Sequence, residues 1–244
     1  LVANGTFDLG SELVTNGDFS SFTGDNPDNF TVLNEDADNF VTESSGQLRM
    51  VSDNSATIAI RANPTDMLTT GKVYKVSVDL TFTTGTLDIS GTQFNTSGTK
   101  VFYLTAPADY IQLAKASTLD VLIDNLSVKQ VDPNDRWSLG TSWSIEDGKL
   151  KNDGTNTGFQ SAQQNNVTVV GDTYEVTVTV EATSGAVELK GSGMYTRIDT
   201  LGVGTHTFNI VADATYIRFL AHASATITLD NFTVREYAIQ PLDV

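Results

Sequence analysis

The chain has 244 residues, of which 39% are hydrophobic, so it is long enough for one large domain or for two domains that each bury a core. Acidic residues outnumber basic ones by 30 to 14, and the net charge of -16 opposes binding to phosphate backbones or anionic membrane surfaces. The lack of cysteine excludes disulfides, thiol nucleophiles and cysteine-ligated zinc. We therefore expect no nucleic-acid partner.

The sequence contains no run of about 18 apolar residues, and its N-terminus lacks a basic-then-apolar signal segment. We predict no insertion into a membrane. The first residue is Leu1 rather than Met, which favours a processed product or part of a longer polypeptide.

The chain opens with two similar segments, LVANGTFD at residues 1–8 and LVTNGDFS at residues 13–20. Only one of these openings is followed directly by a module of its own. Residues 1–10 are therefore predicted to be an N-terminal extra strand, or the remnant of a preceding repeat that belongs to a swapped or truncated neighbour.

The rest of the sequence is an internal repeat with a separation of about one hundred residues. Five segments recur in the same order: Gly46–Leu48, Gly71–Val78, Gly98–Phe102, Ala108–Ile111 and Ile123–Val128 resemble Gly148–Leu150, Gly171–Val178, Gly204–Phe208, Ala214–Ile217 and Leu229–Val234. This pattern indicates duplication of a whole domain. We predict module one at 11–130, module two at 131–237 and a C-terminal tail at 238–244.

Within each module, apolar and polar residues alternate, which is typical of half-buried antiparallel strands. In module two, Tyr174, Val176, Val178 and Val180 fall on one face, with polar residues between them. Similar short runs occur at 57–61, 74–80, 85–89, 101–104, 110–114 and 120–128. The sequence predicts an all-β fold made of two tandem antiparallel β-sandwich domains of the jelly-roll type.

Four motifs occur in a characteristic order: the opening Asn16–Phe19, the segment Trp143–Lys149, the Gly-X-X-Tyr-X-Val strands, and the closing Asp-Asn pairs at 124–125 and 230–231. Together they resemble jelly-roll carbohydrate-binding modules, over nearly all of both halves. The segment Trp137–Trp143 is most similar to the versions found in surface and tail-fibre proteins of bacteriophages.

The resemblance implies a structural calcium ion where the first and last strands meet. Asp124 and Asp230 match the closing position, and Asp8 matches an opening acid, whereas Ser20 replaces that acid in module one. Calcium takes six to eight oxygen ligands, so this departure weakens the expectation. The alternative interpretation of each Asp-Asn pair is a β-bulge whose side chains bond to the backbone.

Sugar binding would require exposed aromatic rings beside hydrogen-bonding side chains. Alternation places Tyr216 and Arg218 on one strand face, with Tyr110 and Gln112 as their counterparts, and Trp143 is the fifth candidate. The alternatives are cross-strand packing for the tyrosines and core packing for both tryptophans, since Trp137 and Trp143 correspond to Phe30 or Phe40.

Catalysis finds little support, since neither His206 nor His222 repeats in module one and no hydrolase or phosphate-binding motif occurs. We predict a non-enzymatic structural or adhesion module of a virion surface or extracellular fibre that binds surface glycans. Its expected partners are other fibre proteins and further copies of itself. The alternative is a carbohydrate-binding pair from a secreted bacterial polysaccharide-degrading enzyme.

Overall fold

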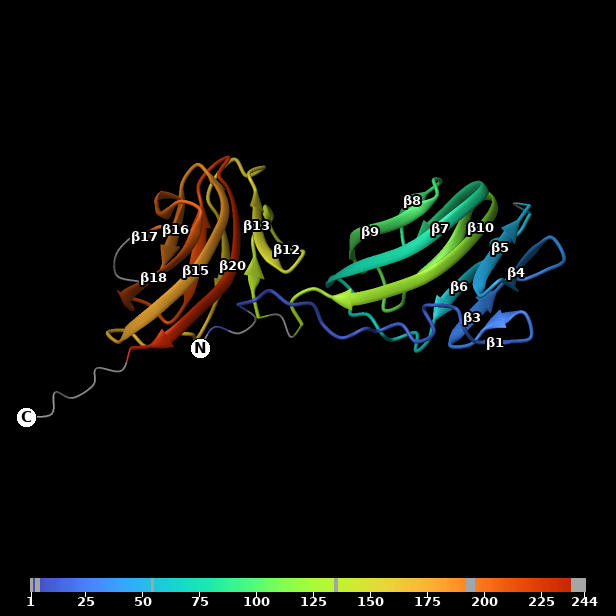
Figure 1. Ribbon diagram of the computed structural model, residues 1–244, viewed down its shortest axis with the longest axis horizontal. Coiled ribbons are helices and arrows are strands. Elements are labelled where there is room, and N and C mark those ends of the chain that lie inside the picture. Colours follow the sequence, from blue (N-terminus) through green and yellow to red (C-terminus); the bar gives the residue numbers. More distant parts are fainter. Residues whose placement is uncertain (1, 3–4, 54, 134–135, 192–195, 238–244) are drawn as a thin grey trace, which may run out of the picture. The chain divides into compact units, whose positions relative to one another are not determined.

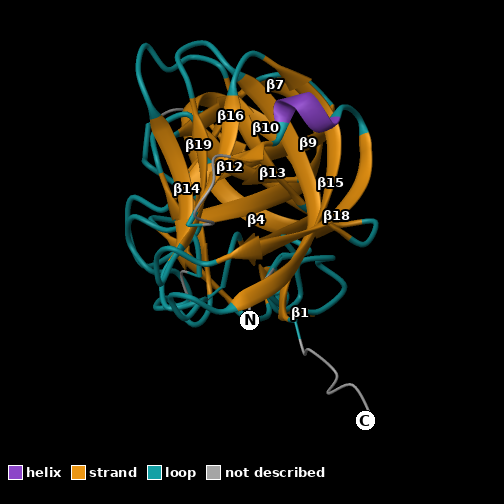
Figure 2. Cartoon of the chain, turned by 90° about the vertical axis from the view of Figure 1, so that its left-hand side faces the viewer, coloured by secondary structure: helices purple, strands orange, loops and turns teal. Residues whose placement is uncertain are grey.

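The computed structural model describes residues 2, 5–53, 55–133, 136–191 and 196–237. Strands and turns make up almost all of this part of the chain, and the helical structure is one 3-10 turn, η1 (Asp199–Leu201). Figure 2 shows the strands in orange and this turn in purple. No helix in the described residues could cross a membrane. The predicted all-β class is confirmed.

The chain divides into two compact units. The inserted unit comprises residues 10–131, and the C-terminal unit combines residues 1–9 with residues 132 onward. Each is an antiparallel β-sandwich, as the sequence predicted. The expected tail at 238–244 lies outside the described residues.

The inserted unit contains ten strands within its described residues: β1 (Phe22–Thr23), β2 (Asn26–Pro27), β3 (Phe30–Leu33), β4 (Asn39–Ser44), β5 (Gln47–Ser52), β6 (Ala59–Ala62), β7 (Val73–Ile89), β8 (Thr92–Phe94), β9 (Gly98–Thr105) and β10 (Gln112–Gln130). Strands β7 and β10 are long enough to run through both layers (Figure 1). One layer is β3-β6-β10-β7-β8 and the other is β4-β5-β10-β7-β9.

The C-terminal unit has the same two layers, built from separate strands. Over its described residues, the first layer runs β11 (Ser138–Leu139), β14 (Gln160–Gln164), β19 (Ile217–Ala221), β16 (Val187–Lys190) and β17 (Thr196–Arg197). The second runs β12 (Trp143–Glu146), β13 (Lys149–Asp153), β20 (Thr226–Glu236), β15 (Thr173–Ser184) and β18 (Gly204–Val211). We call the first layer of each unit the front layer and the second the back layer.

A glycine marks the point where the chain passes from the back layer to the front layer. Gly85 has φ +92° and lies so close to strand β10 that a Cβ atom would be 1.8 Å from the carbonyl oxygen of Thr118. Its counterpart Gly185 has φ +79°, and there β15 ends at Ser184 before β16 begins at Val187. The predicted short strands at 74–80 and 85–89 are thus one strand, because glycine allows the bend without a break.

Both closing Asp-Asn pairs form β-bulges. The segment from Asp124 to Ser127 faces only Asp79 to Ser77 on β7, so β10 carries one extra residue. The C-terminal unit repeats this between β20 and β15. Asn125 and Asn231 take the left-handed backbone conformation, with φ +50° and +49°. This confirms the bulge interpretation and explains why the apolar phase shifts by one residue.

The bulge turns the next residue inward, where the opening segment docks on it. Leu126 donates its backbone N–H to the carbonyl of Gly17 at 2.7 Å, and Phe232 donates to the carbonyl of Gly5 at 2.8 Å. A Cβ on Gly17 or Gly5 would lie 2.0 or 1.8 Å from the carbonyl oxygen of Leu126 or Phe232. Only glycine permits an approach this close.

The phenylalanine of each opening then completes a core. Phe19 packs against Phe30 in the inserted unit, with ring centroids 5.0 Å apart, and Phe7 packs against Trp137 in the C-terminal unit at 5.5 Å. Both opening phenylalanines are fully buried, with φ +46° and +54°. Trp137 therefore takes the place of Phe30, as the sequence comparison suggested.

The first opening segment therefore packs on the module at the other end of the sequence. Residues 1–10 were expected to be an extra strand or the remnant of another repeat. The structure instead places residues 5–9 on the C-terminal unit, with no strand assigned to them. In the sequence, the inserted unit comes between this opening and the rest of the module to which the opening belongs. Linear order could not reveal this, because the contact between Gly5 and Phe232 joins distant segments.

We predict that Phe7→Ala destabilises the C-terminal unit by about 3–5 kcal/mol, because it empties a fully buried aromatic site. The two tryptophans of the chain, Trp137 and Trp143, both lie in this unit. Tryptophan fluorescence during denaturant unfolding therefore reports on it selectively.

The matched control is Phe19→Ala, which should destabilise the inserted unit instead and change the unfolding followed by far-UV circular dichroism. A tryptophan transition that stays at its original midpoint in Phe7→Ala would contradict the assignment of the first opening.

Candidate functional site

The outward face of the front layer carries four of the five predicted binding residues, two at equivalent positions of each unit. In the inserted unit, the Arg61 guanidinium lies 4.0 Å from the centroid of the Tyr110 ring. Arg61 also donates from Nε to Oε1 of Gln112 at 2.7 Å, and the two residues are directly paired between β6 and β10. All three side chains are half-buried. Strand pairing thus assembles a compact Tyr–Arg–Gln group on one face.

The C-terminal unit has the same group with the arginine and glutamine exchanged between strands. Arg218 on β19 lies over the ring of Tyr216, at 4.9 Å from its centroid. Gln163 on β14 is directly paired with Arg218, as Arg61 is with Gln112. The exchange keeps an aromatic ring, a cation and an amide together in both units.

The two groups differ in how the arginine is satisfied. Gln163 donates its amide to Asn165 at 2.5 Å, whereas Gln112 accepts from Arg61. Arg218 Nε is buried without a hydrogen-bond partner, and its Nη2 donates over a long 3.4 Å to the Tyr216 hydroxyl. Leaving a buried donor unpaired costs about 1–3 kcal/mol. The arginine of the C-terminal unit is therefore less completely hydrogen-bonded than Arg61.

Further charged side chains extend the face of the C-terminal unit along β16 and β19. Glu188 accepts from Lys190 at 2.6 Å and from His222 at 2.9 Å. Burial alone would raise the pKa of Glu188, but the hydrogen bonds from Lys190 and His222 outweigh it and lower that pKa. The His222 ring also meets the edge of the 65% exposed Phe159, at 4.7 Å between centroids.

Trp143 does not belong to this surface. Its side chain is only 5% exposed and packs against Phe219 in the core of the C-terminal unit, with ring centroids 6.4 Å apart. By strand register Trp143 takes the place of buried Val41, since Trp143 pairs with Asn152 as Val41 does with Met50. The expectation that Trp143 contacts sugar is corrected, because a buried ring offers no face for stacking.

The carboxylates predicted as calcium ligands accept hydrogen bonds from residues next to them in the sequence. Asp124 and Asp230 each accept the backbone N–H of the following asparagine at 2.7 Å, which holds the bulge. Asp8 accepts the hydroxyl of Thr6. The described residues contain no group of three or more Asp, Glu, His or Cys side chains that could hold a metal. Calcium takes six to eight oxygen ligands, and the structural calcium ion stays a prediction.

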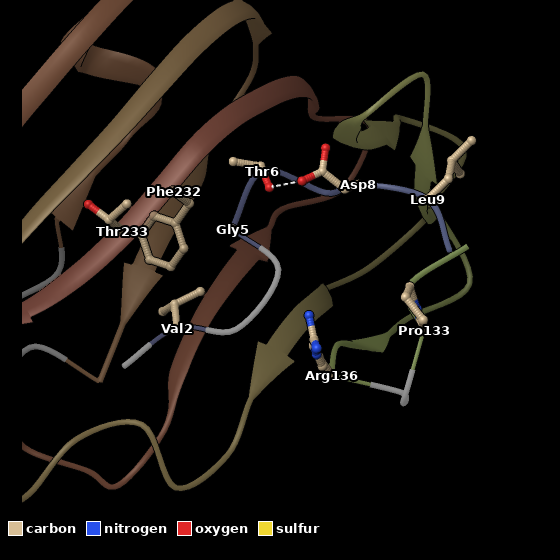
Figure 3. Close-up of a pocket in the computed structure, with 9 residues that line it drawn as sticks. All are labelled: Val2, Gly5, Thr6, Asp8, Leu9, Pro133, Arg136, Phe232 and Thr233. Carbon is tan, nitrogen blue, oxygen red and sulfur yellow. Dashed lines mark hydrogen bonds between the residues drawn. The ribbon is translucent and has the colours of Figure 1, made fainter. Parts of the chain in front are cut away.

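A pocket of about 320 Å³ lies where the first opening docks on the C-terminal unit (Figure 3). The opening contributes Asp8 and Thr6, the bulged strand β20 contributes Phe232, and Arg136 faces them from the segment before β11. Asp8 is the one carboxylate in its lining, whereas glycoside hydrolysis uses a pair.

Sequence reasoning missed Arg61, Gln163, Lys190 and Glu188. Linear alignment of the two halves could not find the first two, because their arginine and glutamine correspond only through strand pairing. His222, which does not repeat in the inserted unit, is half-buried and paired with Glu188. Nothing in linear order places residues 188 and 222 together.

Both units are thus antiparallel β-sandwiches with a polar, aromatic-bearing front face. No known family model matches the sequence, and no curated protein matches it. Among solved structures, the N-terminal CBM22-1–CBM22-2 tandem domain of Paenibacillus barcinonensis Xyn10C shares 11% identity, covering 93% of this chain and 98% of that one, with a TM-score of 0.29.

A second solved structure contains the CBM22-1 and GH10 modules of Clostridium thermocellum xylanase Xyn10B with xylohexaose. It shares 17% identity over 52% of this chain and 29% of that one, with a TM-score of 0.35. At such low TM-scores, neither similarity carries a conclusion about what this chain binds.

The ion pairs of Glu188 generate a pH prediction. Because its folded-state pKa lies below the ordinary 4.5, ionised Glu188 stabilises the fold above that pH, and this contribution is lost as the pH falls through the lowered pKa. Glu188→Gln should therefore lower the unfolding free energy of the C-terminal unit by about 1 kcal/mol near neutral pH. The difference from the wild-type chain should shrink in acid.

Tryptophan-monitored urea unfolding at several pH values measures this effect. Glu181→Gln is the control, because the Glu181–Lys149 pair is about one-third exposed and should contribute little. An equal, pH-independent loss in both variants would show that Glu188 is not stabilised as an anion.

Proposed function

We propose that the front faces of both units bind carbohydrate, and that the chain is a non-enzymatic structural or adhesion module. The observation that carries this proposal is the Tyr–Arg–Gln group, which recurs in both units although its arginine and glutamine have exchanged strands. If the arginine and glutamine served only to hold two strands together, we would not expect both units to keep these residue types after the exchange. Recurrence of the same three chemical functions in one place indicates a shared ligand chemistry.

The chemistry of the group suits a sugar. A tyrosine ring provides an apolar face for the C–H groups of a pyranose, while the arginine and glutamine provide donors and acceptors for its hydroxyls. Stacking of Arg61 on Tyr110 and of Arg218 on Tyr216 also restricts the guanidinium before a ligand arrives. Such preorganisation lowers the entropy lost on binding.

A non-catalytic role is supported by what the acidic residues do. Asp124 and Asp230 hold the two bulges, and Glu188 pairs with Lys190 and His222. The pocket beside the first opening has one carboxylate in its lining rather than a facing pair. None of these carboxylates is arranged as a general acid opposite a nucleophile.

We place this module on a virion surface or an extracellular fibre, where other fibre proteins and copies of the same chain would be its protein partners. The support is the sequence resemblance to phage surface modules and the acidic net charge of -16. The alternative is a carbohydrate-binding pair of a secreted polysaccharide-degrading enzyme. Narrow specificity for one plant or algal polysaccharide would favour the alternative.

A glycan-array and whole-polysaccharide screen of the full chain, with and without calcium, tests the proposal. We expect Tyr110→Ala and Tyr216→Ala each to weaken binding at least fivefold, because each removes a stacking ring worth about 1 kcal/mol or more. The double variant should lose detectable binding.

Tyr103→Ala is a suitable control, since Tyr103 lies on β9 of the back layer. Binding that survives in the double tyrosine variant, or no binding to any glycan by the unmodified chain, would reject the front faces as carbohydrate sites.

A further inference from the structure

The front face of the C-terminal unit has a charge arrangement that its counterpart lacks. Lys190 on β16 is directly paired with Arg218 on β19, so two cations face each other across neighbouring strands. Side chains in such a pair have Cβ atoms about 4.5–5.5 Å apart, and like charges there are destabilising. In the inserted unit the corresponding positions are Ser90 and Gln112, which are neutral.

The negative charge beside this pair does not balance it. Glu188 is the carboxylate that accepts from Lys190, and it is shared with His222. Arg218 has no carboxylate partner among the described residues, although the chain has 30 acidic residues for 14 basic ones. The other arginine of this layer, Arg197, is held by Asp199 through two bonds of 2.8 and 2.6 Å. Arg218 thus differs from Arg197 in lacking a resident counter-ion.

The neighbours of this pair offer groups for the rest of a sugar. Ser138 and Gln163 continue the same row across β11 and β14, and Tyr216 lies beside Arg218. His222, four residues after Arg218, lies about 13 Å further along the strand direction, next to exposed Phe159. An extended saccharide on this face could therefore contact the Tyr216 ring near one end and the Phe159 ring near the other. The Arg218–Lys190 pair would lie between these two rings.

We infer that the front face of the C-terminal unit selects a saccharide with an anionic substituent, which binds between Arg218 and Lys190. This inference rests on the proposed function and adds the ligand class at one of its two faces. A carboxylate of a uronic acid and a sulfate ester share the required chemistry, because both accept charge-assisted hydrogen bonds from two cations. The inserted unit, with Ser90 and Gln112 in these positions, has no such preference.

The test measures binding of the full chain to matched polymers by isothermal titration calorimetry. One arm compares glucuronoxylan with the same polymer after carboxyl reduction, and the other compares a sulfated galactan with its desulfated form. We expect the charged polymer of one arm to bind about tenfold more tightly than its neutral partner, and the arm that shows this identifies the anion. The preference should weaken with added salt.

Arg218→Gln and Lys190→Ser give the C-terminal unit the residue types of the inserted unit, and each should bring the ratio of the affinities for the charged and the neutral polymer close to one. Lys149→Ser removes one positive charge from the back layer and should leave the preference intact. Tryptophan-monitored unfolding confirms that each variant is folded.

Equal binding of the charged and neutral polymers would overturn the anion inference and leave the proposed glycan function standing. Loss of the preference in Lys149→Ser to the same extent would also overturn it, since net charge alone would then be responsible. Failure of every polymer to bind, charged or neutral, would reject the proposed function itself.

Discussion

The docking of a glycine against a bulged strand is the contact on which the rest of each unit depends. The carbonyl of Gly17 accepts the backbone N–H of Leu126, and the carbonyl of Gly5 accepts that of Phe232. The bulge turns Leu126 and Phe232 into the core, and the missing side chain of glycine lets the opening approach them. The buried phenylalanine two residues after each glycine then closes the core. Without this contact, the opening segment would not be attached to its sandwich and its phenylalanine would not fill the core.

This contact also explains the organisation of the chain. The opening of the C-terminal unit comes first in sequence, and the whole inserted unit lies between it and the remainder of its module. Folding of the C-terminal unit therefore requires contacts between residues that are more distant in sequence than any within the inserted unit. Closing a longer loop adds only a modest entropic cost, which makes such an insertion thermodynamically acceptable.

The two front faces show how a duplicated scaffold can keep a chemistry and vary its charge. Back and front layers follow the same order in both units, so each strand position has a counterpart. Tyrosine, arginine and glutamine are kept together, with the arginine on β6 in one unit and on β19 in the other. The neighbouring position differs, with Ser90 in one unit and Lys190 in the other. The shared fold therefore carries two different charge patterns at equivalent positions of its front layers.

The sequence by itself determined the all-β class, the duplication and the alternation that buries Tyr174 and Val176, because these depend on local periodicity and on comparison of the two halves. For the Asp-Asn pairs at Asp124 and Asp230 it offered a bulge as the alternative to a metal site, and the strand register of the structure shows the bulge. The sequence also placed Tyr110 and Gln112 on one face of a strand, and Tyr216 and Arg218 on the equivalent face in the other module. Only the tertiary structure decided that residues 5–9 belong to the C-terminal unit, that Trp143 is buried, and that Arg61, Gln163 and Lys190 join the site. The physical reason is that strand pairing and layer packing bring together residues far apart in the chain, and periodicity within one strand carries no information about which strand lies beside it.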